Sequence, residues 1–466
     1  MPEAVTIPNL MDTEASYQRT LEYLYSFVDY SLTRGFRNQP GLFDLDRLRQ
    51  FMAYLGDPHL AYPILHVAGT KGKGSVCALC ASALQAAGYK VGLYTSPHLQ
   101  DYAERIQINR RPIPHVDLIA LVDEIRPHLD QGTKLTTFEI TTALAFLYFA
   151  RQGATAVVAE VGLGGRLDAT NIVTPLVSVI TSLSYDHMQI LGNTLAEIAG
   201  EKAGIIKPGV PVVLAPQVED ARQVVEQIAS QRRAPLIQVG RDLRYQPLEH
   251  NLDGQTIYVW YAEDQTRYDA FYRGEPGWEP LRLTFPLLGA HQAENAAVAY
   301  AALQALERAG LSLNTDDIRL GFAQSSWPGR FEILQHQPPV VVDSAHNSDS
   351  AGKLRQALQD YFPRKRIVLV FGASEDKDIA GMFDELLPLA SDLIVTRSFH
   401  PRAADPQQLV EEAARHNRQV SIVPAVEDAL VEGLRRLDED SLLLVTGSIF
   451  IAAAARETWY NLTRTE

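Results

Sequence analysis

The stretch 64–87 constrains the fold of this 466-residue chain most strongly, because it is typical of a strand, a glycine-rich loop and a helix in that order. The loop is Gly69-Thr70-Lys71-Gly72-Lys73-Gly74-Ser75. Its backbone N–H groups and the positive end of the helix dipole can hold phosphate oxygens. Lys73 adds a full positive charge, and the hydroxyl of Ser75 can reach a nucleotide-bound magnesium ion. The sequence therefore predicts a nucleotide-binding loop after a buried strand.

The loop departs from the usual P-loop pattern at two positions. That pattern would place glycine at Val67 and serine or threonine at Gly74, so the hydroxyl of Ser75 comes one residue late. The alternative is a glycine-rich turn that carries a solvated lysine. The two lysines, the hydroxyl and the apolar flanks favour phosphate binding over that alternative.

Length and composition indicate a protein of two or three domains. The apolar fraction of 46% and the charged fraction of 21% are ordinary for a globular enzyme. The net charge of −14 argues against a nucleic-acid partner. No window is long and apolar enough for a membrane span, and the first residues do not resemble a secretory signal. We therefore expect a cytoplasmic protein.

The two cysteines, Cys77 and Cys80, form a C-x-x-C in the helix after the loop. A redox motif is one interpretation, and small buried residues are the other. Their place early in that helix favours the second. So low a cysteine content also fits a reducing compartment.

The hydrophobic pattern of residues 1–325 predicts a mainly parallel sheet covered by helices on both faces. A helical pattern covers about 16–55, and several of the expected strands are continuous apolar runs. Strands are expected at 63–68, 90–95, 154–161, 176–181, 210–214 and 235–239, and helices at 74–88, 114–129, 137–152, 194–206, 219–232, 291–309 and 314–322. Segment 241–285 breaks the rhythm with two antiparallel strands, 256–261 and 281–285, joined by a polar loop.

Residues 326–466 repeat the alternation in a smaller, Rossmann-like unit, and Ser325–Gly329 is the best linker. Strands are expected at 339–343, 366–371, 392–396, 419–423 and 441–446, and helices at 350–361, 377–390, 406–416, 425–437 and 449–460. The boundary predicts an ATP-binding domain over 1–325 and a second domain over 326–466.

Polar residues follow the strands of the first unit where an open α/β sheet places its ligands. Glu160 ends one strand, where a carboxylate can simply cap a turn or bind Mg²⁺, and the order of the strands favours Mg²⁺. His187 follows the next strand and could bind metal or orient a phosphate. Lys202, from its spacing alone, is an ordinary solvated helix lysine.

A second group of polar residues surrounds the linker. Asn295, near the start of a helix, could bind an adenine edge or merely belong to the helix start. Arg330 suits a transferring phosphate, and Asp343, at a strand end, suits a ribose hydroxyl or a metal. Each assignment is open when taken alone.

Taken in order, these motifs resemble the folylpolyglutamate synthase/dihydrofolate synthase family of the Mur ligase superfamily. The resemblance rests on Gly69–Ser75, Thr95-Ser96-Pro97-His98-Leu99, Glu160 to Asn171, Asp186-His187, Glu201 to Lys207, Trp327 to Glu332, Asp343 to Asn347 and Thr446-Gly447-Ser448. It covers essentially the whole chain except segment 241–285, whose role stays open. The fold implied is a P-loop-containing central ATPase domain followed by a Rossmann-like glutamate ligase domain.

The resemblance assigns the candidate site residues. It implies ATP binding by Thr70, Lys71, Gly72, Lys73, Gly74, Ser75, Asn295, Arg330 and Asp343. It implies magnesium ligands, for one or two ions, at Ser75, Ser96, Glu160, His187 and a carbamylated Lys202, which reverses the plainer interpretation of that lysine. It implies pterin-substrate contacts at Thr137, Phe138, Glu139, Leu167, Asp168 and Ala169. The catalytic set would be Lys73, Lys202, His346 and Arg330.

The activity implied is the ATP-dependent addition of L-glutamate to a folate or dihydropteroate carboxylate through an acyl phosphate. The implied requirements are ATP, magnesium and, as an open point, a monovalent cation, and we expect a monomer without nucleic-acid or membrane partners. Three alternatives remain: a Mur-type ligase for a cell-wall precursor, an ATP-binding regulator without ligase activity, and a non-catalytic scaffold.

Overall fold

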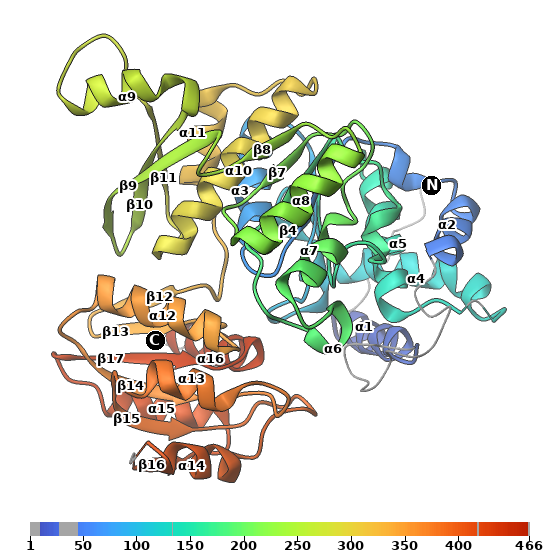
Figure 1. Ribbon diagram of the computed structural model, residues 1–466. Helices are drawn as coiled ribbons and strands as arrows, with labels where there is room; N and C mark the ends of the chain where they lie inside the picture. Colours follow the sequence, from blue (N-terminus) through green and yellow to red (C-terminus); the bar gives the residue numbers. More distant parts are fainter. Residues whose placement is uncertain (1–9, 28–44, 133, 417–418, 465–466) are drawn as a thin grey trace, which may run out of the picture.

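Three β-sheets organise the chain, which is described here from a computed structural model that covers residues 10–27, 45–132, 134–416 and 419–464 (Figure 1). The first sheet has eight strands in the order β4-β3-β2-β5-β1-β6-β7-β8. The strands are β1 (Ile64–Ala68), β2 (Val91–Tyr94), β3 (Ile106–Ile108), β4 (Arg111–Pro112), β5 (Ala156–Glu160), β6 (Val177–Ile180), β7 (Val212–Leu214) and β8 (Leu236–Gln238). All are parallel except β3 and β4, which extend one edge antiparallel.

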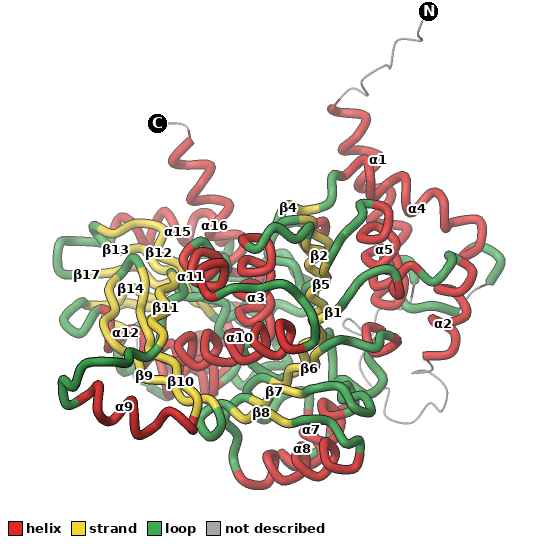
Figure 2. The backbone as a smooth tube through the Cα atoms, turned by 90° about the horizontal axis from the view of Figure 1, so that it is seen from above, coloured by secondary structure: helices red, strands yellow, loops and turns green. Residues whose placement is uncertain are grey.

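Helices cover both faces of the first sheet, because its central strands are apolar along their whole length; every residue of β1 and β5 is buried. One face packs against α3 (Lys73–Ala86), α10 (Ala290–Arg308) and α11 (Thr315–Ala323). The other face packs against α1 (Leu10–Tyr25), α2 (Leu45–Tyr54), α4 (His115–Leu129), α5 (Thr137–Arg151), α7 (Leu195–Ala203) and α8 (Glu219–Gln231). Figure 2 shows α3 and α10 together on one side, away from α4 and α5.

The second sheet is small and antiparallel, with the order β11-β10-β9: β9 (Leu243–Asn251), β10 (Gly254–Tyr261) and β11 (Leu281–Phe285). Its inner residues join the core around α10. The two predicted strands pair as expected, but β9 was not predicted, and the loop between β10 and β11 contains the helix α9 (Gln265–Tyr272).

The third sheet holds the order β12-β13-β17-β14-β15-β16 and is parallel except for β12. Its strands are β12 (Glu332–His336), β13 (Pro339–Val342), β14 (Arg366–Phe371), β15 (Ala390–Val395), β16 (Val420–Ile422) and β17 (Ser441–Thr446). One face packs on α12 (Ser348–Tyr361), α13 (Ile379–Leu386) and α14 (Pro406–Ala414), the other on α15 (Val426–Arg435) and α16 (Ile449–Arg464).

The mixed α/β architecture predicted from the sequence is confirmed, including the parallel strands of the two large sheets. The expected helix 377–390 is too long, because α13 ends at Leu386. Pro388 lacks an N–H group and disfavours helical backbone in the residue before it, so the chain turns there and enters β15. The short strands β3, β4 and β12 were not predicted.

The helical pattern at the N-terminus resolves into α1 and α2, and residues 28–44 between them, including Val28, lie outside the described part of the chain. Within the described residues, no helix combines the length and the apolar character that crossing a membrane requires. Both cysteines lie fully buried in α3, as small core residues should.

Candidate active site

The glycine-rich loop lies between the carboxyl end of β1 and the first turn of α3, as the sequence predicts. The N-cap of α3 is Gly72, which has φ 88° and offers no side chain, so the first N–H groups of the helix have no side-chain cap. The N–H groups of Thr70 and Lys71 donate to the carbonyl of Ser182, at 2.9 and 3.1 Å, and thereby fix the loop beside β6. An uncapped helix N-terminus of this kind binds anions.

The register of the sheet brings Glu160 to this loop, because its Cα partner across the β1–β5 ladder is Val67. Its Oε1 lies 3.8 Å from Nζ of Lys73, and its Oε2 accepts a hydrogen bond of 3.3 Å from the N–H group of Ser96. Burial raises the pKa of Glu160, and the positive charge of Lys73 opposes that rise. Ser75 is also buried, on the first turn of α3.

Lys202 reaches the same loop from α7. Its Nζ donates a 2.9 Å hydrogen bond to the carbonyl of Gly69, and its side chain is buried. Burial and the nearby charge of Lys73 lower the pKa of Lys202 to about 7. A substantial fraction of this amine is therefore neutral near neutral pH, which an ordinary solvated lysine is not.

The carboxylate of Asp186 joins the loop to the third-sheet unit. Nζ of Lys71 lies 3.0 Å from Oδ2 of Asp186 and 3.4 Å from Nε2 of His346, and the amide of Asn347 lies 3.4 Å from the same Asp186 oxygen. Because a carbonyl only accepts, Nδ1 of His346 must donate to the carbonyl of Ser344, 3.0 Å away, which leaves the lone pair of Nε2 facing Lys71. Burial lowers the pKa of His346 to about 3, so the ring is neutral.

Asn295 and Asp343 approach the loop and the linker from opposite units. Asn295 is buried on α10 and lies directly against Gly72. Asp343 follows β13, and its two oxygens accept hydrogen bonds from the N–H groups of Phe331, at 2.7 Å, and Ala345, at 2.8 Å. Burial raises the pKa of Asp343, and the charge of Arg330 opposes that rise. Asp343 therefore braces the chain beside Arg330 in this structure.

His187 lies at the edge of the site, beside Asp186. It has φ 49°, its side chain is half exposed, and its Nε2 lies 3.8 Å from Oδ1 of Asp186. Within the described residues, no group of three or more histidine, cysteine, aspartate or glutamate side chains is arranged to hold a metal ion. Magnesium that arrives with a nucleotide takes most of its ligands from phosphates and water, so the single carboxylate of Glu160 and the Ser75 hydroxyl suit such an ion.

Of the six predicted pterin contacts, Phe138 lies most directly on the glycine turn after β5. A Cβ atom at Gly162 would lie 2.4 Å from Cζ of Phe138. Its neighbours serve the local structure: Thr137 donates to the carbonyl of Leu24, at 3.0 Å, and Glu139 accepts from the N–H group of Thr136, at 2.8 Å.

The second trio of predicted pterin contacts closes the same turn. Oδ2 of Asp168 accepts from the N–H groups of Gly162, at 3.0 Å, and Leu163, at 2.9 Å. Burial raises the pKa of this carboxyl, and the bond from the Thr170 hydroxyl opposes that rise. Ala169 is buried and Leu167 partly buried beside it. Asp168 therefore shapes the turn that Phe138 covers.

The linker explains why the loop departs from the usual pattern at Gly74. A Cβ atom at Gly74 would lie 2.6 Å from Cζ2 of Trp327. The indole ring thus occupies the space that a serine or threonine side chain would need. This contact was not predicted, although the unusual glycine was its visible signal in the sequence.

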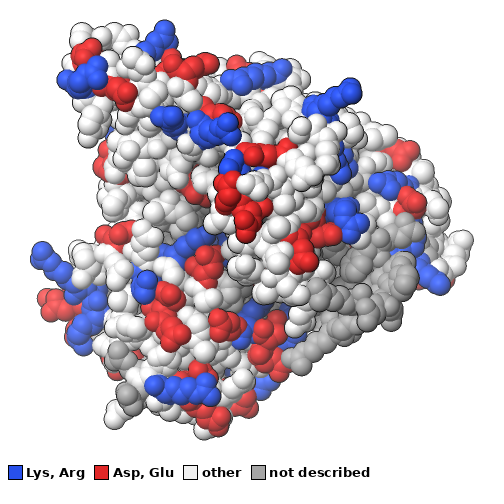
Figure 3. All heavy atoms as spheres, in the orientation of Figure 1, with Lys and Arg blue, Asp and Glu red and all other residues white. Residues whose placement is uncertain are grey.

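A cavity of about 240 Å³ lies where the two large units meet, and both contribute to its walls. Its lining includes Thr95, His98, Trp327, Arg330, Ile449 and Arg456. Figure 3 shows the molecule hollowed between the upper and lower lobes, with basic and acidic side chains interspersed over that face. The arrangement suits two small substrates held between units.

The fold and the site define the class of protein. Two family models match in chain order: the Mur ligase middle domain over residues 67–303, and the Mur ligase glutamate ligase domain over residues 329–449. The chain therefore has the architecture of an ATP-dependent Mur-type ligase, with the glycine-rich loop in the first match and Asp343 in the second.

Curated relatives and solved structures narrow this class. The dihydrofolate synthase/folylpolyglutamate synthase of Bacillus subtilis is 38% identical over 449 residues, which cover 95% of this chain and 99% of that protein. The folylpolyglutamate synthase of Mycobacterium tuberculosis, solved with ADP, superposes with a TM-score of 0.82 at 31% identity and covers 96% of this chain and 99% of its own. A folylpolyglutamate synthase solved in complex with AMPPCP and folate superposes with a TM-score of 0.78 at 32% identity. The match covers 95% of this chain and 99% of that chain.

The chain belongs to the dihydrofolate synthase/folylpolyglutamate synthase family of Mur ligases. It is accordingly a ligase that forms carbon–nitrogen bonds with the use of ATP. The resemblance stated from the sequence motifs is confirmed.

Proposed function

We propose that this protein activates a folate or dihydropteroate carboxylate with ATP and joins L-glutamate to it. The observation that carries the proposal is the meeting at one sheet edge of an uncapped helix N-terminus, Lys73 and Glu160, with Lys202 beneath the loop. The relatives and the solved complexes with ADP, AMPPCP and folate support the choice of substrates.

The chemistry has a clear need for these groups. A carboxylate is a poor electrophile, because its charge repels a nucleophile and its oxygen leaves badly. Transfer of the γ-phosphoryl group of ATP to one carboxylate oxygen gives an acyl phosphate, whose phosphate leaves well. The neutral amine of L-glutamate then attacks the acyl carbon, and collapse of the tetrahedral intermediate gives an amide and phosphate.

The first step brings two anions together, and cationic side chains offset their repulsion. Lys73 and the N–H groups at the start of α3 would hold the triphosphate from one side, and Arg330 would approach the transferring group from the linker. One or two magnesium ions would neutralise charge at the phosphates. Their protein ligands would be Ser75, Ser96, Glu160, His187 and a carbamylated Lys202.

Lys202 suits carbamylation because its amine is buried and its pKa is lowered to about 7, so the nucleophilic neutral form is available to carbon dioxide. The carbamate would replace a cation with an anionic oxygen ligand near Lys73. Asn295 would contact the adenine part of ATP, and Phe138 with Asp168 would frame the pterin. His346, whose Nε2 lone pair faces Lys71, would lie near the reacting groups.

The acyl phosphate must be kept from water, which a site between two units favours. We propose that both dihydropteroate and reduced folates are accepted, and that the protein acts as a cytoplasmic monomer. Whether a monovalent cation is also needed is a matter for the same assay.

The test is a phosphate-release assay with ATP and L-glutamate that offers dihydropteroate and tetrahydrofolate separately, with mass spectrometry of the products. Glutamate-dependent phosphate release with a glutamyl product from either acceptor is the expected result. Release only with a nucleotide-sugar peptide would assign the chain to cell-wall chemistry instead, and nucleotide binding without glutamate-dependent release would make it a regulator. Repeating the assay with and without potassium decides whether the enzyme requires a monovalent cation.

A further inference from the structure

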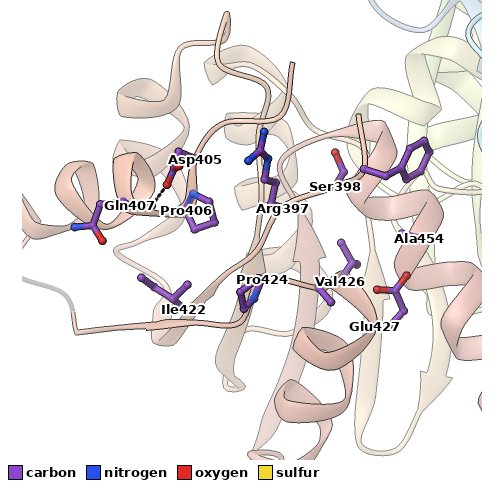
Figure 4. A pocket seen from close by; sticks show the side chains of 12 residues that line it. Arg397, Ser398, Asp405, Pro406, Gln407, Ile422, Pro424, Val426, Glu427 and Ala454 are labelled. Atoms are coloured by element: carbon purple, nitrogen blue, oxygen red, sulfur yellow. Dashed lines mark hydrogen bonds between the residues drawn. The ribbon is translucent and has the colours of Figure 1, made fainter. Parts of the chain in front are cut away.

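A larger cavity, of about 550 Å³, lies at the carboxyl ends of β15 and β16 in the third-sheet unit (Figure 4). Its walls come from the segment after β15, the segment after β16 and α16 at the partly buried Ala454. Cavities of this volume accommodate small ligands, and the carboxyl edge of a parallel sheet is where open α/β folds place them. None of the candidate site residues named above lines it.

Two polar side chains in the cavity wall have no partner among the described residues. Arg397 is exposed and forms no ion pair with any residue that the structure describes. Ser398 is only 8% exposed, and its hydroxyl has no hydrogen-bond partner within the described residues. The hydroxyl oxygen itself is open to solvent at the cavity wall, so it can donate a hydrogen bond to an acceptor that enters. Because the guanidinium of Arg397 belongs to the same wall, the acceptor that fits is a carboxylate.

The two helix N-termini at the cavity differ in what they offer. Asp405 caps α14 by accepting from the N–H group of Gln407, at 2.8 Å, so that end is already satisfied. The N-cap of α15 is Ala425, which has no side-chain hydrogen bond to give. The first N–H groups of α15 thus add partial positive charge to the side of the cavity formed after β16.

The rest of the lining matches a ligand that alternates methylene and amide groups. Phe399 is 86% exposed, Ile422 is 46% exposed, and Pro406 and Pro424 complete an apolar surface. Glu427 stands beside Ala454 and apart from Arg397 in Figure 4, where it can accept a hydrogen bond from an amide N–H group. A chain of γ-linked glutamyl residues carries one carboxylate, two methylenes and one amide N–H group per repeat.

The first turns of α16 separate this cavity from the one between the two large units. Ala454 lines the larger cavity, whereas Ile449 and Arg456 line the other together with Arg330. The ring of His400 stacks on Phe450 at 4.1 Å between ring centroids, beside the exposed Phe399. The two cavities thus share the first turns of α16 as a wall, and a chain that reaches from one to the other would pass this helix end.

We propose that the cavity at Arg397 and Ser398 binds the α-carboxylate of glutamyl residues already joined to the substrate. It would hold a growing γ-glutamyl chain while the next residue is added. This inference rests on the proposed function, because it assigns a place to the product of repeated glutamate addition.

The first test is direct binding, because it needs no catalysis. Tri-γ-L-glutamate is titrated into the wild-type protein, the Arg397→Gln variant and the Arg435→Gln variant by calorimetry. Arg435 is the matched control: its side chain is 74% exposed at the far end of α15, outside the cavity. We expect the Arg397→Gln change to weaken binding at least about tenfold, as the loss of a charge-assisted hydrogen bond does, and the control to bind like wild type. No binding to the wild-type protein, or equal binding to all three, would overturn the proposal.

The second test separates the chain from free glutamate. Each protein is given tetrahydrofolate that carries either one or three glutamyl residues. The Arg397→Gln and Ser398→Ala variants should keep the wild-type KM for L-glutamate and for the monoglutamate, raise the KM for the triglutamate and yield shorter products. A raised KM for free L-glutamate would place the incoming amino acid in the cavity and defeat the proposal. Failure of all ligase activity in the wild-type protein would refute the proposed function, while the calorimetric result would still decide the site.

Discussion

A Cβ atom added at Gly72 would lie 2.2 Å from Oδ1 of Asn295, so the carboxamide of Asn295 fills the space that any side chain at position 72 would need. Gly72 is the N-cap of α3 and Asn295 lies on α10, where its Nδ2 donates 2.9 Å to Oε1 of Gln292. The nucleotide loop thus packs against α10 at Gly72, the residue that has no side chain. This contact explains a glycine that the loop pattern alone attributes to phosphate access.

We expect Gly72→Ala to lower the affinity for ATP at least about tenfold while the protein still folds. The new methyl group must displace Asn295, and the loop N–H groups then move away from the phosphates that they are placed to hold. Calorimetric titration with AMPPCP measures the loss, and circular dichroism checks the fold.

Gly88→Ala is the matched control for this variant. Gly88 has φ +87°, almost the same as +88° at Gly72, but no atom lies within 4 Å of its added Cβ. It therefore bears the backbone strain of about 1 kcal/mol without the collision. Equal nucleotide affinity in the two alanine variants would show that the contact with Asn295 does not hold the loop.

Much of the fold was predictable, because its central strands are uniform apolar runs. All residues of β1, β5 and β17 are buried, and such runs indicate a parallel sheet covered on both faces. The strands that were missed lack that signal: β9 is largely exposed and polar, and β3 has only three residues. Tertiary pairing with a neighbour, which the sequence does not display, makes these segments strands.

The site was predictable where one segment carries the chemistry and unpredictable where two distant segments meet. The loop around Lys73 and the strand-end Glu160 were identified from local patterns, and the sheet register places them 3.8 Å apart. The contacts of Lys71 with Asp186 and of Trp327 with Gly74 join residues more than a hundred positions apart. The pattern also could not show that the hydroxyl of Thr137 holds a carbonyl of α1.

We expect Lys73→Ala to reduce ATP-dependent phosphate release by a factor on the order of 10²–10³, as the loss of a group that stabilises developing negative charge does. The fold should survive, because burial already raises the pKa of Glu160 and this carboxyl can take up a proton when its cation is gone. Phosphate release and thermal unfolding are measured side by side. Wild-type turnover in this variant would refute the assignment of the loop, and Arg435→Ala is the surface control.

The stability of the first unit should fall as pH drops below about 6.5, in part because of His66. This side chain is fully buried on β1, with Nε2 2.8 Å from Oγ1 of Thr170, and burial lowers its pKa to about 3. Between these two values the unfolded chain binds a proton that the folded chain does not bind. Stability is thus lost as pH falls, by about 2 kcal/mol from about pH 6.5 to about pH 5 for this group.

The variant that tests this dependence is His66→Gln, which keeps a donor for Thr170 and cannot titrate in this range. The drop in melting temperature between about pH 7 and about pH 5 should be smaller in His66→Gln than in wild type. His336→Gln, an exposed position on β12, should behave like wild type. Parallel pH profiles for all three proteins would show that His66 does not contribute.

Lys202→Ala should lose most of the ligase activity and regain part of it when a short carboxylic acid is added. The side chain of Lys202 is buried under the loop, and a substantial fraction of its amine is neutral and can react with carbon dioxide. The carbamate proposed there would act as an anionic oxygen donor. Acetate or propionate can enter the space left by the truncated side chain and supply that oxygen. Phosphate release is measured against acid concentration at fixed ionic strength.

The control is Lys207→Ala, since Nζ of Lys207 donates to the carbonyl of Asn171 at 2.9 Å and has no proposed carbamate. Whatever activity that variant keeps should not respond to the acids. In wild-type protein equilibrated with ¹³C-labelled bicarbonate, a carbamate resonance should appear that Lys202→Ala lacks. If Lys202→Ala is fully active and does not respond to the acids, Lys202 is not a metal ligand. Its role would then be limited to the hydrogen bond to the carbonyl of Gly69.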